Sequence, residues 1–256
     1  MTDGVKVALL THAGGAHVGA YLSALQATDE CSSVVLGDPD GRWTAEAERV
    51  LGGKLVRTER DQRRLLADEK PQMALVTMEA RLAPPVIDAA LDAGCHVFAE
   101  KPACVRVEDF EPLVAKADRQ HRYLMLALAN RLNPETVAGR GLTHAGKTGA
   151  VYGTQMPLTT DQTQRTRSSH PDESFAHKGR AGGGHLIWLG IHWLDLAMHV
   201  SGSRIEHAAG FTANVGGQPI DVEDSAAAAL QFENGTLGTL TSGYYLDRGY
   251  HSHIKI

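Results

Sequence analysis

The chain has 256 residues, of which 43% are hydrophobic and 21% are charged, and its formal net charge at pH 7 is -5. This length suits one large domain or two modest ones, and we expect two. Acidic and basic residues are interspersed, so the sequence offers neither a basic stripe for nucleic acid nor a cationic helix for a membrane surface. Without a cationic leader or an apolar run of membrane-spanning length, we expect a cytoplasmic protein with no nucleic-acid or membrane partner.

The first half alternates short apolar runs with helix-period stretches, which is typical of βαβ units in a parallel sheet. We expect strands at residues 5–10, 34–36, 55–56, 73–77, 95–99 and 123–128. We expect the helices between them at residues 19–27, 44–51, 61–68, 84–93 and 107–120. This alternation ends after residue 128, so we place the first domain at residues 1–128.

The second half, residues 129–256, has a different periodicity. Glycines at 139–149 indicate a hinge region, and a polar stretch follows at 159–178. Period-two segments predict strands at residues 208–214, 226–232, 236–244 and 251–256, with an Asn234-Gly235 hairpin turn between two of them. We therefore expect a mostly antiparallel open sheet with a helix on one face. Because the last strand stops abruptly, we expect a shortened sheet with an edge that another subunit can pair with.

The cysteine and histidine patterns argue against a structural metal site. The cysteines are Cys31, Cys95 and Cys104. Because they are odd in number and form no CxxC pair, we expect reduced thiols. Three of the 13 histidines recur every seven residues, about 10 Å apart along a helix and too distant to share one ion. We therefore predict no metal ligand.

A glycine triplet at residues 182–184 leads into an apolar helix that carries one polar stripe. At about 100° per residue, five side chains fall on one side of this helix. They are His185, Trp188, His192, Asp195 and His199. A buried helix must aim such a stripe at partners or at a cavity, because unpaired polar groups in a core are costly. Periodicity alone leaves two interpretations open, satisfied core histidines and a functional site.

The turn after the first strand is rich in glycine and reads Thr11-His-Ala-Gly-Gly-Ala-His-Val-Gly19. Such a turn lets the backbone approach a pyrophosphate at a helix N-terminus. Its spacing departs from G-x-G-x-x-G, so an ordinary glycine-rich connection stays open. Asp38 follows about 20 residues later, where a carboxylate can accept both ribose hydroxyls and would repel a 2'-phosphate. This favours NAD over NADP, although Arg42 lies nearby, and an exposed turn aspartate is the alternative.

Four motifs occur in order along the chain. They are Ala93-Gly94-Cys95-His96-Val97, Ala99-Glu100-Lys101-Pro102, Asn130-Arg131-Leu132-Asn133-Pro134 and the segment from Gly182 to Asp195. Together they resemble the glucose-fructose oxidoreductase and inositol dehydrogenase family (Gfo/Idh/MocA). The resemblance implies an N-terminal Rossmann domain with a doubly wound parallel sheet and a C-terminal α+β domain for substrate binding and oligomerisation. It also implies NAD-dependent oxidation or reduction of a sugar or cyclitol carbon, by a homo-oligomer formed through the C-terminal sheet.

The resemblance further implies roles for particular residues. Lys101 would lie beside the nicotinamide and stabilise a developing alkoxide, and His192 would accept the hydroxyl proton. We expect the cofactor to contact Thr11, His12, Gly14, Gly15, Asp38, Thr77, Met78, Glu100 and Lys101. We expect the substrate to contact Lys101, Arg180, Trp188 and His192.

The chain departs from the family pattern at Trp188, where relatives commonly carry an aspartate one helical turn before the histidine. Trp188 could form an apolar wall for a sugar face or pack in the core. Asp195 could orient His192 in place of that aspartate, or serve the structure. Glu79 and Arg81 stand where relatives have a T-P-N type loop, and their roles are open.

Three functions are compatible with these residues. The first is an NAD-dependent oxidoreductase acting on a sugar, cyclitol or polyol derivative. The second is an enzyme that retains NAD and cleaves a glycosidic bond through transient oxidation. The third is a non-catalytic protein that binds NAD or a sugar.

Overall fold

The structure is a computed structural model that describes residues 4–161, 173–217, 219–246 and 248–256. The chain divides into two compact units, Met1–Ala127 and Leu128–Ile256. The expected fold class is confirmed, with a parallel sheet in the first unit and a mostly antiparallel sheet in the second. Residues 162–172 of the polar stretch lie outside the described residues. No helix among the described residues is long and apolar enough to cross a membrane.

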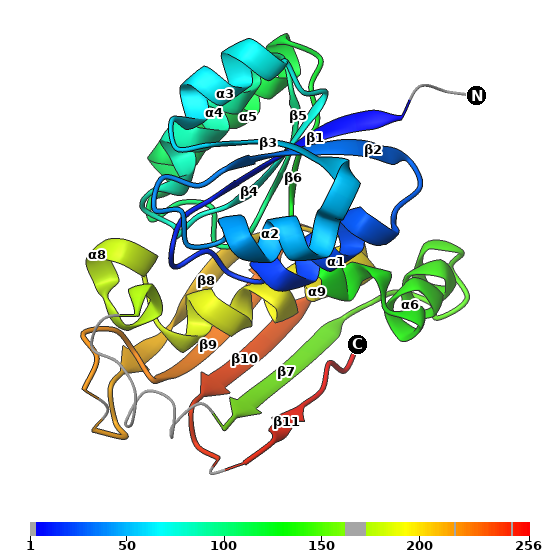
Figure 1. Ribbon diagram of the computed structural model, residues 1–256. Coiled ribbons are helices and arrows are strands. Elements are labelled where there is room, and N and C mark those ends of the chain that lie inside the picture. The colour runs from blue at the N-terminus through cyan, green and yellow to red at the C-terminus, as the bar shows by residue number, and fades with distance from the viewer. Residues whose placement is uncertain (1–3, 162–172, 218, 247) are drawn as a thin grey trace. The chain divides into compact units, whose positions relative to one another are not determined.

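The first unit alternates strands with helices along its whole length (Figure 1). The strands are β1 (Val5–Thr11), β2 (Cys31–Gly37), β3 (Leu55–Glu59), β4 (Met73–Thr77), β5 (His96–Ala99) and β6 (Leu124–Leu126). The helices are α1 (Val18–Ala27), α2 (Thr44–Leu51), α3 (Gln62–Glu69), α4 (Ala83–Asp92) and α5 (Val107–Arg119), with a 3-10 turn η1 (Gly52–Lys54). The strands run parallel in the order β3-β2-β1-β4-β5-β6, the doubly wound order of a dinucleotide-binding sheet.

Helices cover both faces of this sheet, which explains why its central strand β4 is a continuous, mostly apolar run, whereas the edge strand β3 alternates in burial. Helices α1 and α2 lie on one face, and α3, α4 and α5 lie on the other (Figure 1). Leu9 and Leu22 belong to the core under α1 and α2, whereas Leu10 and Ile87 belong to the opposite core. The strand order reverses between β1 and β4, so a ligand crevice is expected at the carboxyl ends of these strands.

The second unit contains a five-stranded sheet in the order β11-β7-β10-β9-β8. Its strands are β7 (Gly153–Thr160), β8 (Ile205–Ala213), β9 (Ser225–Phe232), β10 (Leu237–Gly243) and β11 (Tyr250–Ser252). Its helical elements are η2 (Ala129–Leu132), α6 (Pro134–His144), η3 (Ser174–Ala176), α8 (Lys178–Ala181), η4 (Leu186–Gly190) and α9 (Ile191–Ser201). β7 and β10 pair in parallel and the other pairs are antiparallel. The predicted hairpin turn is confirmed, and Gly235 adopts a φ of 84° there.

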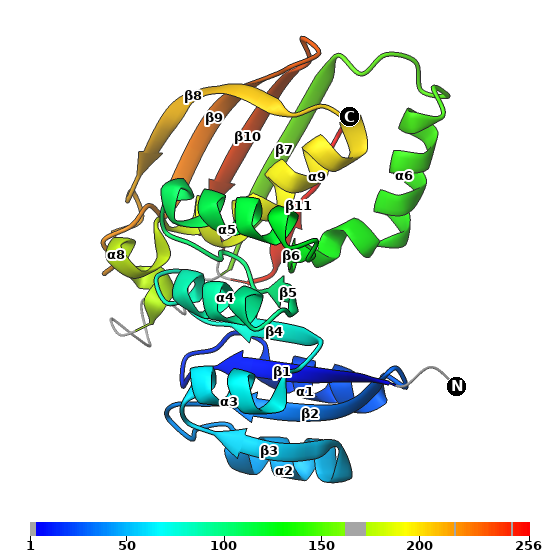
Figure 2. The same ribbon diagram turned by 90° about the horizontal axis from the view of Figure 1, so that it is seen from above.

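Helix α9 packs on one face of this sheet and leaves the other face uncovered within the unit (Figure 2). Met156, Leu230 and Leu240 point toward the helix and form the core with Ala197. We call the uncovered side the open face. Its side chains are uncharged, and all of them are small except for one aromatic ring. The open face consists of Ala209, Phe211, Ala227, Ala229, Thr239 and Thr241.

Helix α6 and strand β7 of the second unit were not predicted. The expected hinge at residues 139–149 is wrong, because α6 runs through Gly139 and Gly141 to His144. Pro134 at the first helical position favours this start, and packing against α9 outweighs the poor helix propensity of glycine. Strand β7 was missed although its buried residues alternate, because Pro157 usually argues against an interior strand.

Candidate functional site

The glycine-rich turn is held against the ends of β1 and β4. The hydroxyl of Thr77 donates to the carbonyl of Ala16 at 2.6 Å, and the hydroxyl of Thr11 lies 3.3 Å from the carbonyl of Thr77. A side chain on Gly15 would place its Cβ 2.8 Å from that same carbonyl oxygen. Only glycine fits at this position, so the backbone of the turn forms the surface that a ligand would meet.

Helix α1 begins directly after this turn. His17 is its N-cap residue, with a left-handed φ of 58°, and no side chain caps the first N–H groups. These N–H groups and the positive end of the helix dipole favour an anion. The turn therefore has the donors that a diphosphate requires.

Asp38 lies at the end of β2 and is only 2% exposed. The interpretation as an exposed turn aspartate is therefore wrong. Its Oδ2 accepts the N–H of Trp43 at 2.7 Å, whereas its buried Oδ1 has no partner among the described residues. Asp38 lines a pocket of about 400 Å³ together with Gly41, Thr44, Thr58, Glu59 and Arg60. A buried oxygen without a donor is costly, so this pocket suits a ligand with hydroxyl groups, such as a ribose.

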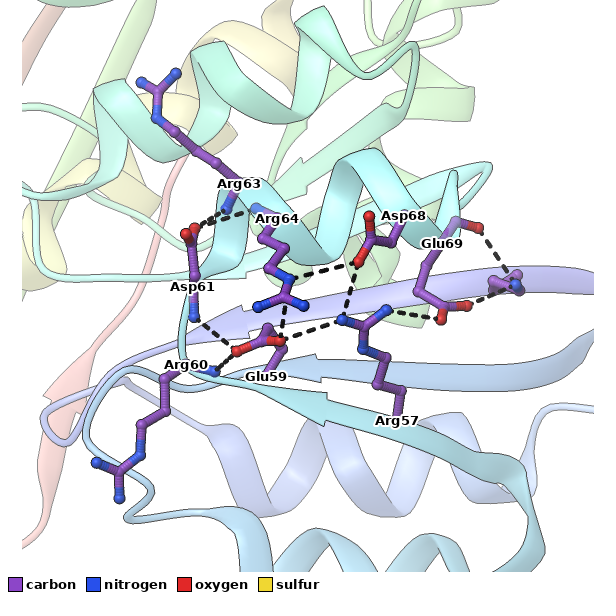
Figure 3. Close-up of polar contacts among 9 residues, drawn as sticks. Arg57, Glu59, Arg60, Asp61, Arg63, Arg64, Asp68 and Glu69 are labelled. Carbon is purple, nitrogen blue, oxygen red and sulfur yellow. Dashed lines mark hydrogen bonds and ion pairs between the residues drawn. The ribbon is translucent and has the colours of Figure 1, made fainter.

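Glu59, which lines this pocket, belongs to a group of ion pairs between β3 and α3, which Figure 3 shows. Arg57 contacts the carboxylates of Glu59 at 3.1 Å, Asp68 at 3.0 Å and Glu69 at 3.3 Å. Arg64 contacts Asp68 at 3.7 Å from the next turn of α3. These arginines are therefore occupied by protein carboxylates.

Arg60 differs from them and was not singled out in the sequence. Figure 3 shows its side chain turned away from the ion pairs around Arg57. Its guanidinium lies over Gly41, where a Cβ would come within 3.5 Å of Nη2. Arg60 thus places a positive charge beside Asp38 in the pocket. The signal was a basic residue directly after a strand of the parallel sheet.

The E-K-P segment begins where β5 ends, and its two charged residues are buried. The carboxylate of Glu100 accepts the hydroxyl of Tyr21 at 2.5 Å and the backbone N–H of Lys101 at 2.9 Å, and His17 Nδ1 lies 2.8 Å from it. Lys101 is 6% exposed, and this burial lowers the pKa of its ammonium group while the charge of Glu100 opposes the change. A lysine with a lowered pKa gives up a proton more readily, which suits chemistry at a hydroxyl.

The end of β4 and the turn after β1 are tied together by His12. Its Nε2 lies 3.2 Å from the backbone nitrogen of Glu79, whose carboxylate contacts Arg81 at 3.8 Å. Thr77 and Met78 are buried beside them. Within the first unit, the structure thus brings the predicted cofactor residues to the carboxyl ends of the neighbouring strands β2, β1, β4 and β5.

In the second unit, Glu223 holds the start of the stripe helix. Its carboxylate accepts the N–H groups of Gly184 at 2.7 Å and Leu186 at 3.1 Å, and its carbonyl accepts that of His185 at 3.1 Å. A Cβ on Gly184 would lie 2.9 Å from the carbonyl carbon of Glu223, and closer to its oxygen. Gly184 of the triplet is therefore needed for this close approach. Sequence reasoning missed Glu223, although the acidic pair Glu223-Asp224 just before a predicted strand was a usable signal.

The polar stripe does not keep the spacing of a regular helix, because residues Leu186–Gly190 form a π-helix before α9. His185, which precedes the π-helix, is fully buried between Thr160 and Ser242, with its Nε2 3.0 Å from the hydroxyl of Thr160. Burial lowers the pKa of His185 to about 4, so the ring is neutral at physiological pH. His185 is a satisfied core histidine, one of the two interpretations left open above.

Asp195 and His199 have structural partners. The buried carboxylate of Asp195 is bound through both oxygens by Arg131 of the N-R-L-N-P motif, with Nε 2.8 Å from Oδ2. His199 Nδ1 lies 3.2 Å from Nη1 of Arg140 on α6. The motif thus anchors the stripe helix to the start of the unit, and the orienting role of Asp195 toward His192 stays a prediction.

Trp188 and His192 are both partly exposed. The ring of Trp188 on the π-helix packs against the buried ring of Phe175 on η3, with centroids 5.4 Å apart. Arg180 lies on the short helix α8 before the glycine triplet. Because Lys101 belongs to the first unit and His192 to the second, their convergence on one substrate stays a prediction.

Comparisons with known proteins agree with this description of the two units. Residues 13–128 match the oxidoreductase family with an NAD-binding Rossmann fold, and residues 137–256 match the GFO/IDH/MocA C-terminal domain.

Individual relatives are distant. The chain is 30% identical to D-glucoside 3-dehydrogenase of Escherichia coli (strain K12) over 172 residues, which are 62% of this chain and 48% of the relative. It is 22% identical to myo-inositol 2-dehydrogenase of Thermotoga maritima over 201 residues, 77% of this chain and 57% of the relative. A structure of levoglucosan dehydrogenase in complex with NADH and levoglucosan has a TM-score of 0.84 at 20% identity, covering 98% of this chain and 70% of that one. The chain spans about half the length of the curated relatives it matches.

Proposed function

Because the chain belongs to the Gfo/Idh/MocA oxidoreductase family, we propose that it is an NAD-dependent dehydrogenase or reductase. Its reaction moves a hydride between nicotinamide and a hydroxyl or carbonyl carbon of a sugar, cyclitol or polyol derivative. The observation that carries the proposal is the set of strand ends in the first unit. There, the turn has no room for a side chain at Gly15, Asp38 has a buried oxygen without a partner among the described residues, and Lys101 is buried. These features support a dinucleotide at the strand ends.

Different residues of the chain would hold different parts of the cofactor. The N–H groups at the start of α1, which follows the turn at Gly15, would hold the diphosphate, and Asp38 would accept the ribose hydroxyls. The negative charge of Asp38 favours NAD over NADP, and Arg60 moderates that preference. Thr77 and Met78 would flank the nicotinamide end, beside the E-K-P segment.

When it is bound, the nicotinamide ring supplies or accepts the hydride. Lys101 donates a hydrogen bond to the substrate oxygen and stabilises negative charge there, which its low exposure strengthens because buried charges are poorly screened. His192 takes the hydroxyl proton, and its partial exposure lets the proton pass on to water. The pair thus separates charge stabilisation from proton transfer.

The substrate surface differs from a purely polar sugar site. Trp188, which packs on the buried Phe175, would present an aromatic face that suits the C–H face of a pyranose or cyclitol ring. Arg180 would contact substrate oxygens. Trp188 occupies the position of a carboxylate common in relatives, so this chain binds its substrate there by apolar contact.

We also propose that the protein is a homo-oligomer joined through the open face. This surface carries small and uncharged side chains, and Phe211 on it is 87% exposed. A flat, uncharged sheet face with an exposed aromatic ring is typical of a subunit contact. Light scattering after size exclusion tests this, because F211D then gives a smaller mass than the unaltered chain.

The activity is tested by measuring NADH formation on a panel of sugars and cyclitols. K101M and H192N are expected to lower kcat by at least about 100-fold, the contribution of a positioned acid or base, whereas the exposed Lys147→Met serves as a matched control. Substrate consumption without net NADH indicates the NAD-retaining glycosidase instead. Tight NAD binding with neither product indicates a binding protein.

A further inference from the structure

His17 is an unusual residue for a dinucleotide-binding turn. It is the residue before α1, in a left-handed conformation that non-glycine residues seldom adopt. Its side chain is 57% exposed, so the ring is accessible to a ligand at the turn. Nδ1 is engaged 2.8 Å from Glu100, and no group among the described residues pairs with Nε2.

The charges around the turn explain why a cation is useful there. Asp40 accepts the N–H of Ala13 at 2.7 Å, and Glu100 lies buried behind His17, so two carboxylates border the site of an anionic ligand. Such charges repel a diphosphate unless a cation offsets them. His17 is the titratable side chain of the turn that bonds to Glu100, and it is accessible.

We propose that the protonated ring of His17 binds the diphosphate of the dinucleotide through Nε2, and that the protonation of this ring sets how tightly the cofactor is held. This inference rests on the proposed function, because it requires a dinucleotide at the turn. The inference adds a cofactor ligand and a pH dependence that the E-K-P motif alone does not provide. Glu100 of that motif contacts the ring of His17 and also accepts the backbone N–H of Lys101.

The direction of the effect follows from the groups that face the ring. The hydrogen bond to Glu100 raises the pKa of His17, whereas desolvation and the charge of Lys101 oppose this. Tyr21 shares the same carboxylate, and burial raises its pKa, so it stays protonated throughout. A bound diphosphate would raise the pKa of His17 further. Cofactor affinity should therefore be highest at low pH and fall as pH rises through the pKa of His17.

The experiment is a calorimetric titration of the 256-residue chain with ADP-ribose and with adenosine between pH 5.5 and 9, run in parallel in buffers of different ionisation enthalpy. ADP-ribose carries the diphosphate but lacks nicotinamide, and adenosine lacks both.

H17N removes the charge and suits the left-handed backbone, since asparagine tolerates it. H17K keeps a positive charge across this pH range, and Lys70 adopts a φ of 45° in the same chain. H121N is the control, because His121 is also left-handed and exposed but precedes β6, at the opposite ends of the strands.

We expect ADP-ribose affinity to fall about tenfold with rising pH, the worth of one charge-assisted hydrogen bond, with proton uptake on binding. H17N should bind at the lower level at every pH, H17K at the higher level, and H121N as the unaltered chain does. Adenosine affinity should be the same in all four proteins.

A flat profile of ADP-ribose affinity against pH in the unaltered chain, or an H17N variant that behaves like the unaltered chain, overturns the inference and leaves the proposed function standing. An equal loss of adenosine affinity in H17N also overturns it. Absence of any ADP-ribose binding at every pH overturns the cofactor site itself.

Discussion

Replacing Gly15 by alanine tests whether the glycine-rich turn is pressed against the ends of β1 and β4. The added Cβ would lie 2.8 Å from the carbonyl oxygen of Thr77 and closer still to the hydroxyl of Thr11, whereas ordinary contact begins at 3.4 Å. The Thr77 carbonyl belongs to the sheet backbone and cannot rotate away, so the turn must retreat by about half an ångström. Overpacking of this kind costs about 1–3 kcal/mol of folding free energy.

The retreat also moves the N–H groups that would hold the diphosphate. A displacement of this size lengthens hydrogen bonds that are effective only at about 2.9 Å, so we expect G15A to bind ADP-ribose at least about tenfold more weakly. Stability is measured by urea unfolding and affinity by calorimetry. The matched control is G19A, because a Cβ on Gly19 meets nothing within 4 Å and this residue lies in the first turn of α1. G19A should gain about 0.5–1 kcal/mol from the better helix propensity of alanine.

The reasoning is refuted if G15A matches the unaltered chain in both the midpoint of urea unfolding and the ADP-ribose affinity. It is also refuted if G19A loses as much of either quantity as G15A. In both cases the turn would have more room than the distances to Thr77 allow.

Three further predictions test other parts of the two units. E223A removes the acceptor of two helix N–H groups and should lower the unfolding free energy by about 2–3 kcal/mol, which urea unfolding at neutral pH measures. His185 has a pKa of about 4 in the folded chain against 6.5 in the unfolded chain, so its protonation favours unfolding. About 3 kcal/mol of stability should therefore be lost as pH falls from 6.5 to 4, and H185N should lack this dependence of stability on pH. R60A should weaken ADP-ribose binding about threefold or more through the lost contact in the Asp38 pocket. R63A should leave the affinity unchanged, because Arg63 is not among the residues that line that pocket and Figure 3 shows its side chain pointing away from Arg60.

The elements of the first unit follow from local patterns. Residues Met73–Thr77 form β4 and Thr44–Leu51 form α2, as the apolar runs and the helix period predict. Parallel strands buried on both faces leave little ambiguity, because each one must be a short continuous apolar run. In the second unit, α6 and β7 were missed because glycine and proline usually interrupt elements, and only packing on α9 and pairing with β10 outweigh that tendency.

The residues of the candidate site could be predicted from the sequence, but the groups that they contact could not. The turn at Gly15 was recognisable by its glycines and the acid at Asp38 by its distance from that turn, and the structure shows that Asp38 is buried and that Gly15 packs tightly against the strand ends. The polar stripe was recognisable too, yet its members meet different surroundings. A period cannot distinguish His185, which lies in the core, from His192, which is partly exposed, because burial depends on which strands lie opposite.

By itself, the amino-acid sequence determined the order of strands and helices in the first unit, the turn beside β1 and the family to which the chain belongs, because these depend on residues close together along the chain. Only the tertiary structure decided which charges meet: Glu100 with His17, and Asp195 with Arg131. These pairs lie 83 and 64 residues apart in the chain. Their contact results from the packing of whole elements, and it is these contacts that set the charge and the position of the side chains on which the proposed chemistry depends.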